Sequence, residues 1–238
     1  MGFISLDQIT NMVVHLRQPI GGGSKAGTGT LVTKDGRPFI LTAQHVANDI
    51  TSTGELVVKG PGDLPIVLPV GKVIDGHQIQ WTPHPEADLA AFEIKPQDKE
   101  TVTALQNRFL PLSFFSHLRA SPSRDLTLTS IGFPLGLGTQ GYFSPLTFES
   151  KASSGLLTLP RADTNTMQAF FALENPSVGG YSGCPIADFS VFKAGGITTT
   201  GGGSVLYGVM HGTISDSTGG KIAMVTPAFY VHELMKII

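Results

Sequence analysis

Charged residues are scarce in this sequence, and cysteine occurs once. Lys, Arg, Asp and Glu make up 14% of the 238 residues, against about a quarter in an average globular domain. The formal net charge is −2 and the basic residues are scattered, so the sequence lacks the basic surface of a nucleic-acid-binding protein. Cys184 alone cannot form an intrachain disulfide, which favours a reducing compartment.

Long apolar runs are also missing. No segment approaches the roughly 20 apolar residues of a membrane-spanning helix. The first residues, MGFISLDQITNMVVHLR, contain polar side chains where a signal peptide has an uninterrupted apolar run. Leu6 stands where a myristoylation motif requires Ser or Thr. We therefore expect a chain with no membrane partner that is cytoplasmic or cut from a larger precursor.

Glycine and proline, by contrast, are abundant, with 29 and 16 residues. Short apolar runs alternate with turn signals, which is typical of an all-β protein. Asp35-Gly36 separates two such runs and predicts a tight hairpin. The final segment, PAFYVHELMKII, has apolar residues at helical spacing and predicts a short C-terminal helix.

A more polar, irregular segment divides the strand pattern into two halves of about six strand-like runs each. We interpret this segment as an interdomain linker. The predicted organisation is an N-terminal segment (1–12), a first β unit (13–96), the linker (97–124), a second β unit (125–227) and the C-terminal helix (228–238).

Three polar residues stand out against this background. Ser182 lies between glycines in GGYSGCPI, His45 follows an apolar strand in ILTAQHVAN, and Asp88 precedes a strand in HPEADLAAFEI. Taken singly, each is more simply explained as a turn or surface residue. Together they occur in the order His, Asp, Ser across two β halves, and unrelated hydrolase folds use other orders for the same chemistry.

These motifs resemble those of the chymotrypsin-fold (trypsin-like) serine peptidases, in the style of the bacterial HtrA-like and viral branches. GTGTLV with ILTAQHV is similar to the family's histidine motif, DLAAFEI to its aspartate strand, and GYSGCP to its serine loop. IGFPLGLG is similar to the strand that begins the second barrel. The resemblance runs from about residue 13 to 227 and implies two antiparallel six-stranded β-barrels with the active site between them.

The resemblance implies a serine endopeptidase acting on polypeptides through a catalytic triad. Ser182 would attack the scissile carbonyl, His45 would accept its proton, and Asp88 would orient His45. The backbone N–H groups of Gly180 and Ser182 would form the oxyanion hole. The chemistry requires no cofactor.

Two other patterns are set aside. GGGSKAGT lacks the spacing of a phosphate-binding loop and is interpreted as a surface hairpin tip. The histidines show no pair at metal-binding helical spacing, and one cysteine cannot build a structural zinc site. We therefore expect no metal.

Two positions depart from the family pattern. Tyr181 stands where extracellular members have the Asp that pairs with a newly cleaved amino terminus. The resemblance therefore implies activity without such cleavage. Cys184 replaces a glycine of the motif two residues after the serine, and we expect it to be a small buried side chain rather than the nucleophile.

The resemblance also locates a specificity pocket, with Pro176 and Ser177 at its floor and the strand containing Met210, His211 and Gly212 as its wall. Trypsins have an Asp at this floor, and this chain has none. Because side chains alternate along a strand, we expect His211 to point away from the pocket that Met210 faces. We predict cleavage after small or medium apolar residues such as Val, Ala or Leu.

Two other interpretations remain open. A catalytically silent relative could use the same fold as a protein-binding module. A viral peptidase that processes a polyprotein would use the same chemistry. The presence of all three triad residues favours an enzyme, and the sequence does not identify a regulatory partner.

Overall fold

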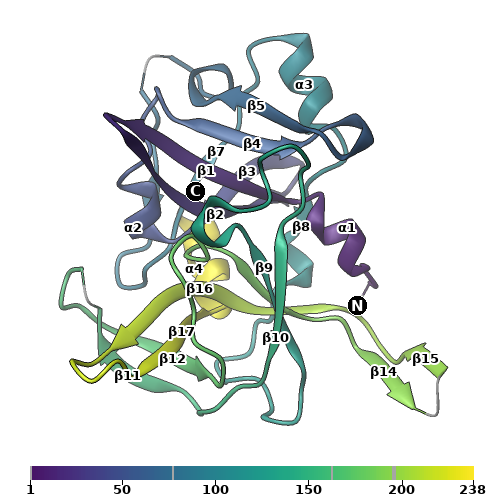
Figure 1. The fold of residues 1–238 in the computed structure, drawn as a ribbon, viewed down its shortest axis with the longest axis vertical. Helices are drawn as coiled ribbons and strands as arrows, with labels where there is room; N and C mark the ends of the chain where they lie inside the picture. The colour runs from purple at the N-terminus through teal and green to yellow at the C-terminus, as the bar shows by residue number, and fades with distance from the viewer. Residues whose placement is uncertain (1, 77, 162, 195–196) are drawn as a thin grey trace.

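The computed structural model describes residues 2–76, 78–161, 163–194 and 197–238, and side chains except those of 191–200. Two antiparallel sheets make up most of the chain (Figure 1). The first has the strand order β5-β4-β1-β2-β3-β7-β6, and β8 adds to β2 in parallel. Its strands are β1 (Val13–Ile20), β2 (Gly23–Lys34), β3 (Arg37–Thr42), β4 (Glu55–Lys59), β5 (Pro65–Pro69), β6 (Thr82–Pro83), β7 (Ala90–Glu93) and β8 (Leu110–Pro111).

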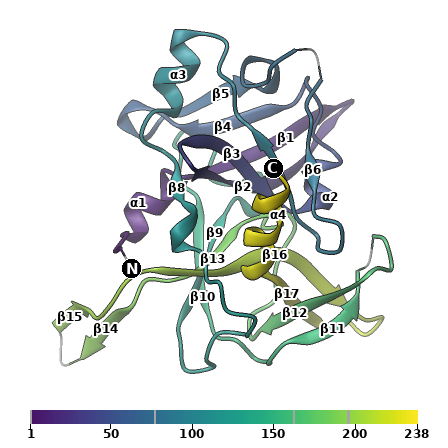
Figure 2. The ribbon, with the colours of Figure 1, turned by 180° about the vertical axis from the view of Figure 1, so that it is seen from behind.

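The second sheet has the order β10-β9-β13-β16-β17-β12-β11. A separate two-stranded ribbon, β14 with β15, projects away from it (Figures 1 and 2). The strands are β9 (Leu128–Gly132), β10 (Leu146–Ser150), β11 (Leu157–Pro160), β12 (Met167–Leu173), β13 (Pro185–Asp188), β14 (Val191–Ala194), β15 (Ile197–Thr200), β16 (Val205–Ser215) and β17 (Lys221–Pro227).

The described residues also form four short α-helices, and the last covers the junction of the sheets seen from behind in Figure 2. They are α1 (Leu6–Thr10), α2 (Gln44–Ala47), α3 (Lys99–Leu105) and α4 (Phe229–Ile237). The 3₁₀ segments are Pro61–Asp63, Val70–Lys72, Leu112–Phe114 and Pro134–Gly136. None of the helices in the described part of the chain is long and apolar enough to cross a membrane.

The all-β class with a short C-terminal helix is confirmed. The predicted Asp35-Gly36 hairpin is present between β2 and β3, where both residues have positive φ, 51° and 78°. Within the described residues the sheets contain eight and seven strands rather than six each. Part of the difference comes from very short strands, β6 and β8, of two residues each.

The segment GGGSKAGT forms a surface hairpin tip, as predicted: β1 and β2 are joined by a turn at the exposed Gly21 and Gly22, and β2 begins at Gly23. One local expectation needs correction. The segment 97–124 is not irregular throughout. It begins with α3, where the Asp98 side chain caps the helix by accepting from the Thr101 N–H at 2.7 Å.

The largest core cluster runs through both sheets and α4. Phe39 and Leu41 of the first sheet, Ile131 of the second and Leu234 of α4 belong to it, and all four are fully buried. Ile9 of α1 also belongs to this cluster. Burying one such side chain contributes roughly 1.5 to 3 kcal/mol. The halves are thus joined by a common core.

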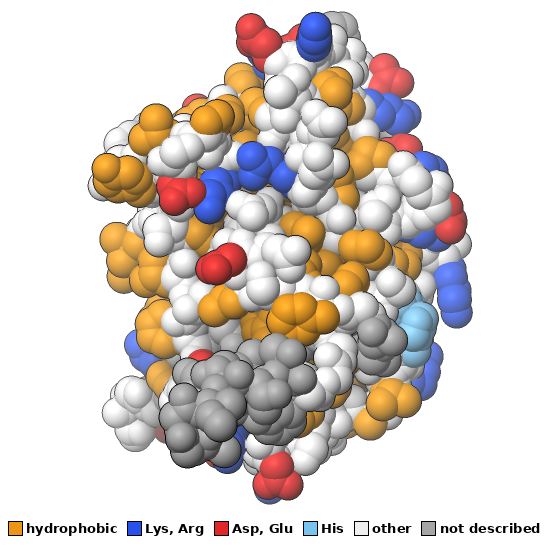
Figure 3. Space-filling view, turned by 90° about the vertical axis from the view of Figure 1, so that its right-hand side faces the viewer, with side chains coloured by type: hydrophobic (Ala, Val, Ile, Leu, Met, Phe, Trp, Pro, Cys, Tyr) orange, Lys and Arg blue, Asp and Glu red, His pale blue; other side chains and the backbone are white. Residues whose placement is uncertain are grey.

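On the face drawn in Figure 3, blue Lys and Arg side chains are scattered among acidic and apolar ones. This distribution agrees with the low and nearly balanced charge of the sequence.

Candidate active site

His45 lies on α2, a single helical turn that follows β3. Its backbone N–H donates to Asp88 Oδ1 at 3.0 Å, and its Nδ1 lies 2.8 Å from Asp88 Oδ2. The side chain of His45 is 35% exposed, whereas that of Asp88 is fully buried. The buried Asp88 therefore orients the imidazole, and another part of the His45 side chain is exposed to solvent.

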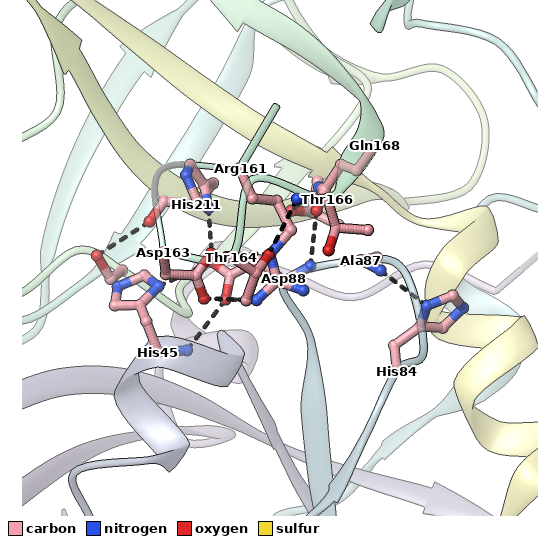
Figure 4. Close-up of polar contacts among 12 residues, drawn as sticks. His45, His84, Ala87, Asp88, Arg161, Asp163, Thr164, Thr166, Gln168 and His211 are labelled. Atoms are coloured by element: carbon pink, nitrogen blue, oxygen red, sulfur yellow. Dashed lines mark hydrogen bonds and ion pairs between the residues drawn. The ribbon is translucent and has the colours of Figure 1, made fainter. Parts of the chain in front are cut away.

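Asp88 lies two residues before β7 and is held by the second sheet as well. Its N–H donates to Gln168 Oε1 at 2.7 Å, and Gln168 Nε2 donates to Thr226 Oγ1 at 2.9 Å. A guanidinium nitrogen of Arg161 lies 3.5 Å from Asp88 Oδ1, and Arg161 also pairs with Asp163 at 2.6 Å (Figure 4). These contacts leave Oδ2 as the oxygen that faces the histidines.

His84 organises the turn that leads into Asp88. Its Nδ1 accepts the backbone N–H group of Ala87 at 2.9 Å (Figure 4) and that of Glu86 at 3.1 Å. Its Nε2 lies 3.4 Å from the Glu233 carboxylate on α4. Burial lowers the pKa of His84 below its ordinary value despite the nearby Glu233. The neutral ring with a free Nδ1 lone pair is the form that this turn needs.

His211 brings a second imidazole to the same carboxylate. Its Nδ1 lies 2.5 Å from Asp88 Oδ2, and its ring is perpendicular to that of His45, with centroids 5.7 Å apart (Figure 4). The register of β16 against β17 shifts between Met210 and Gly212. Met210 lines the pocket beside the serine loop and His211 does not, whereas the His211 ring contacts Asp88, a contact that strand alternation did not predict.

The electrostatics of the pair follow from these contacts. Burial alone would raise the pKa of Asp88, but hydrogen bonds from His211 and His45 hold it well below its usual range. Burial opposes a charge on His45, yet the hydrogen bond and the negative charge of Asp88 outweigh it and raise the pKa of His45 above 6.5. Asp88 is thus an ionised acceptor, and His45 is a stronger base than free imidazole.

The loop that carries Ser182 is anchored to the first sheet at Thr28. The Thr28 N–H donates to Ser182 O at 2.8 Å, and the Thr28 hydroxyl donates to Gly180 O at 2.8 Å. Gly183 has φ +86°, and a Cβ there would lie 2.0 Å from Thr28 O. Only glycine fits this close approach between the two sheets.

The Ser182 hydroxyl donates to His211 O at 3.1 Å. No hydrogen bond joins Ser182 Oγ to His45 among the described residues. His211 therefore contacts Asp88 through its ring and the Ser182 hydroxyl through its backbone carbonyl group.

Gly180 lies where the loop approaches Phe133. It has φ +97°, and a Cβ would lie 2.4 Å from Phe133 O. Across the described residues, no protein acceptor takes a hydrogen bond from the N–H groups of Gly180 and Ser182. Both donors are available to a bound group.

A pocket lies beside this loop and contains part of the predicted substrate-binding set, namely Pro176, Ser177 and Met210. His211 and Gly212 do not line it. None of the described residues that line it is charged. The others are Ser130, Phe148, Ser150, Leu173, Asn175, Val178 and Tyr181.

Tyr181 and Cys184 are both buried in the second sheet. The Tyr181 hydroxyl donates to Leu146 O at 3.3 Å, and the ring packs edge-on against Phe148. Burial raises the pKa of the Cys184 thiol, which is fully buried. A thiol in this state is a poor nucleophile.

A family model described as a trypsin-like peptidase domain matches residues 27–196, which include His45, Asp88 and Ser182. The chain belongs to the trypsin-like peptidase family. Among curated proteins, the search found no match.

Solved structures of this peptidase fold are similar at low sequence identity. The HtrA-type protease AlgW is 17% identical with a TM-score of 0.57, over 97% of this chain and 61% of that one. The active form of the Rv3671c protease from M. tuberculosis is 15% identical, with a TM-score of 0.61 over 97% and 82%. A scabies mite inactivated protease paralogue is 15% identical, with a TM-score of 0.62 over 100% and 98%. The chain thus spans about three fifths of the HtrA-type protease, and these likenesses show the fold.

Proposed function

We propose that this trypsin-like peptidase is a serine endopeptidase in which Ser182 is the nucleophile, His45 the general base and Asp88 the residue that orients it. The observation that carries the proposal is the pairing of His45 Nδ1 with the buried Asp88 carboxylate at 2.8 Å. A carboxylate accepts only, so Nδ1 bears the proton and Nε2 keeps a lone pair for the serine. The exposed side of His45 faces solvent, where a substrate has access.

The reaction would begin when the Ser182 hydroxyl leaves His211 O and turns to His45. Its proton would pass to His45 Nε2 as Oγ bonds to the scissile carbonyl carbon. Asp88 would stabilise the resulting imidazolium, and His45 would then protonate the leaving amine. Water would then attack the acyl carbon while His45 Nε2 takes a proton from it. The His45 imidazolium would return a proton to Ser182 Oγ as the acyl group leaves the serine.

The unpaired N–H groups of Gly180 and Ser182 support an oxyanion hole at this loop. A donor of this kind contributes about 3 kcal/mol to transition-state stabilisation. The rigid contacts of Gly180 with Thr28 and Phe133 would keep it in place without reorganisation during the reaction.

The pocket beside the loop would accept the side chain that precedes the cleaved bond. Its uncharged lining, which includes the large side chains of Met210, Phe148 and Leu173, favours small or medium apolar side chains over Lys, Arg, Asp or Glu. Such a pocket discriminates by about 1 to 3 kcal/mol per methylene. We therefore propose polypeptides cut after residues such as Val, Ala or Leu.

The test compares the parent with Ser182→Ala and with a control, Ser153→Ala, which removes an exposed hydroxyl outside the site. A fluorophosphonate probe reacts with an activated serine, and a peptide library reports hydrolysis. We expect the parent and the control to be labelled and active. Ser182→Ala should lose labelling and on the order of 10⁶-fold in rate.

A parent that folds, shows no labelling and cuts no peptide in the library would instead support the silent binding module. Equal hydrolysis by Ser182→Ala and the parent would show that the nucleophile is wrongly assigned.

A further inference from the structure

The strongest cluster of potential metal ligands in the described residues is His45, Asp88 and His211. One ligand atom from each residue lies within 4.8 Å of the others. The three residues come from α2, the turn before β7 and the β16 bulge. Sequence spacing therefore could not reveal this cluster, because its members meet only in the folded chain.

We propose that this cluster is an inhibitory Zn²⁺ site, in which His45 Nδ1, His211 Nδ1 and Asp88 Oδ2 bind one ion. Two imidazoles and one carboxylate form a donor set that Zn²⁺ uses with a fourth position left for water. The inhibition rests on the proposed serine mechanism, whereas the binding does not.

The geometry suits an ion of this size. Both Nδ1 atoms already converge on Oδ2, at 2.8 Å for His45 and 2.5 Å for His211. Ligand atoms around a tetrahedral zinc with bonds of about 2.0 to 2.1 Å lie about 3.3 Å apart. Each nitrogen would move away from Oδ2 by less than about 1 Å, and the three ligand atoms, which lie within 4.8 Å of one another, would have to reach this common spacing.

The residues around the Asp88 carboxylate leave one of its oxygen atoms for a metal ion. The His45 N–H and Arg161 occupy Oδ1, so Oδ2 is the oxygen that remains for an ion. Asp163 compensates the charge of Arg161 by a bidentate pair. The side chains of His45 and His211 are 35% and 11% exposed, whereas that of Asp88 is fully buried.

Zn²⁺ at this position would stop catalysis because it would change the tautomer of His45. In the resting enzyme Nδ1 carries the proton and Nε2 carries the lone pair that accepts the serine proton. A metal on Nδ1 takes the lone pair of that nitrogen, so the single proton of the neutral ring moves to Nε2. His45 then has no lone pair for Ser182, and no net proton is released.

Binding is tested by chelator competition in the Ser182→Ala background, which does not depend on hydrolysis. We expect one Zn²⁺ per chain, and affinities at least about tenfold weaker in His45→Gln and in His211→Gln. His117→Ala is the matched control, because it removes an exposed imidazole that stacks on His232. Its affinity should match that of the background.

Long-range ¹H–¹⁵N spectra of the same protein report the tautomer. Addition of Zn²⁺ should move the proton of His45 from Nδ1 to Nε2. Unchanged spectra, or equal Zn²⁺ affinity in His45→Gln, His211→Gln and the background, would overturn the site. Because His45 is partly exposed, we expect His45→Gln to fold. If this variant has the circular dichroism spectrum of the background but does not bind Zn²⁺, the loss of binding reflects the missing ligand and not misfolding.

The parent enzyme supplies the inhibition test. Zn²⁺ should reduce hydrolysis, a chelator should restore it, and Mg²⁺, which prefers oxygen ligands, should have no effect. Zinc binding without hydrolysis under any condition would contradict the proposed function and leave the site standing. Hydrolysis that Zn²⁺ does not inhibit would contradict the inhibitory role.

Discussion

Replacing His15 with Leu should make the stability of this protein less sensitive to acid. His15 lies on β1, is 3% exposed, and packs against Phe133 with ring centroids 5.2 Å apart. Neither ring nitrogen has a hydrogen-bond partner among the described residues. Burial, with a smaller effect from the charge of Arg17, lowers the pKa of His15 from 6.5 to about 4.

The sign and size of the effect follow from this shift. The unfolded chain takes up a proton on His15 below about pH 6.5, whereas the folded chain resists it until about pH 4. Stability contributed by the neutral ring is therefore complete above the unfolded pKa and is lost as the pH falls toward the folded one. Between about pH 7.5 and about pH 4.5 the loss amounts to about 2.5 kcal/mol.

The assay is urea unfolding at these two pH values, in the Ser182→Ala background to prevent self-cleavage. The parent should lose about 2.5 kcal/mol more than His15→Leu on acidification. At the higher pH, His15→Leu should be at least as stable as the parent, because it removes two unpaired polar atoms.

Val57→Ala, at the residue paired with His15 on β4, serves as the control. It should lower stability equally at both pH values, since it removes packing and no titrating group. Acid responses of His15→Leu and the parent within about 0.5 kcal/mol of each other would show that His15 is not the titrating group.

Three further outcomes are expected. Cys184→Ala should keep hydrolysis within about twofold and lose about 1 kcal/mol in urea unfolding; an inactive but folded variant would restore the thiol as a candidate nucleophile. Asp163→Asn should move the acidic limb of the kcat/KM profile to lower pH, because the charge of Asp163 raises the pKa of His45; a limb that moves upward would contradict this. Met210→Ala should shift peptide-library preference toward larger apolar residues such as Phe, and an unchanged profile would show that another pocket reads the substrate.

His45, Asp88 and Ser182 could be predicted because each belongs to a local motif at a strand end or in a tight loop. The β2–β3 hairpin and α4 were predictable for the same reason, since Asp35-Gly36 and the apolar spacing of the last residues act locally. The structure brings His45 and Asp88 into contact. The catalytic roles of His45, Asp88 and Ser182 stay predictions, which labelling and hydrolysis assays will test.

The remaining parts of the site depend on long-range packing. Arg161 and Gln168 reach Asp88 from the second sheet, and neither stands in a motif. His211 reaches it through a bulge, and a simple alternating strand gives no sign of a register shift. α3 was missed because its helical signal consists of one capping aspartate and a few polar residues.

The contacts of Thr28 join two parts of the chain that are synthesised at different times. The serine loop makes hydrogen bonds within its own half, from the Gly183 N–H to Met210 O at 2.8 Å and from the Leu135 N–H to Gly179 O at 2.7 Å, and it joins the first sheet, which is synthesised earlier, through Thr28. A nascent chain would hold His45 and Asp88 before Ser182 has been synthesised, and the Thr28 contacts would form only when the later half docks. Neither half expressed alone should cleave peptides. The proposed activity would therefore be absent during translation and would begin only after both halves have folded together.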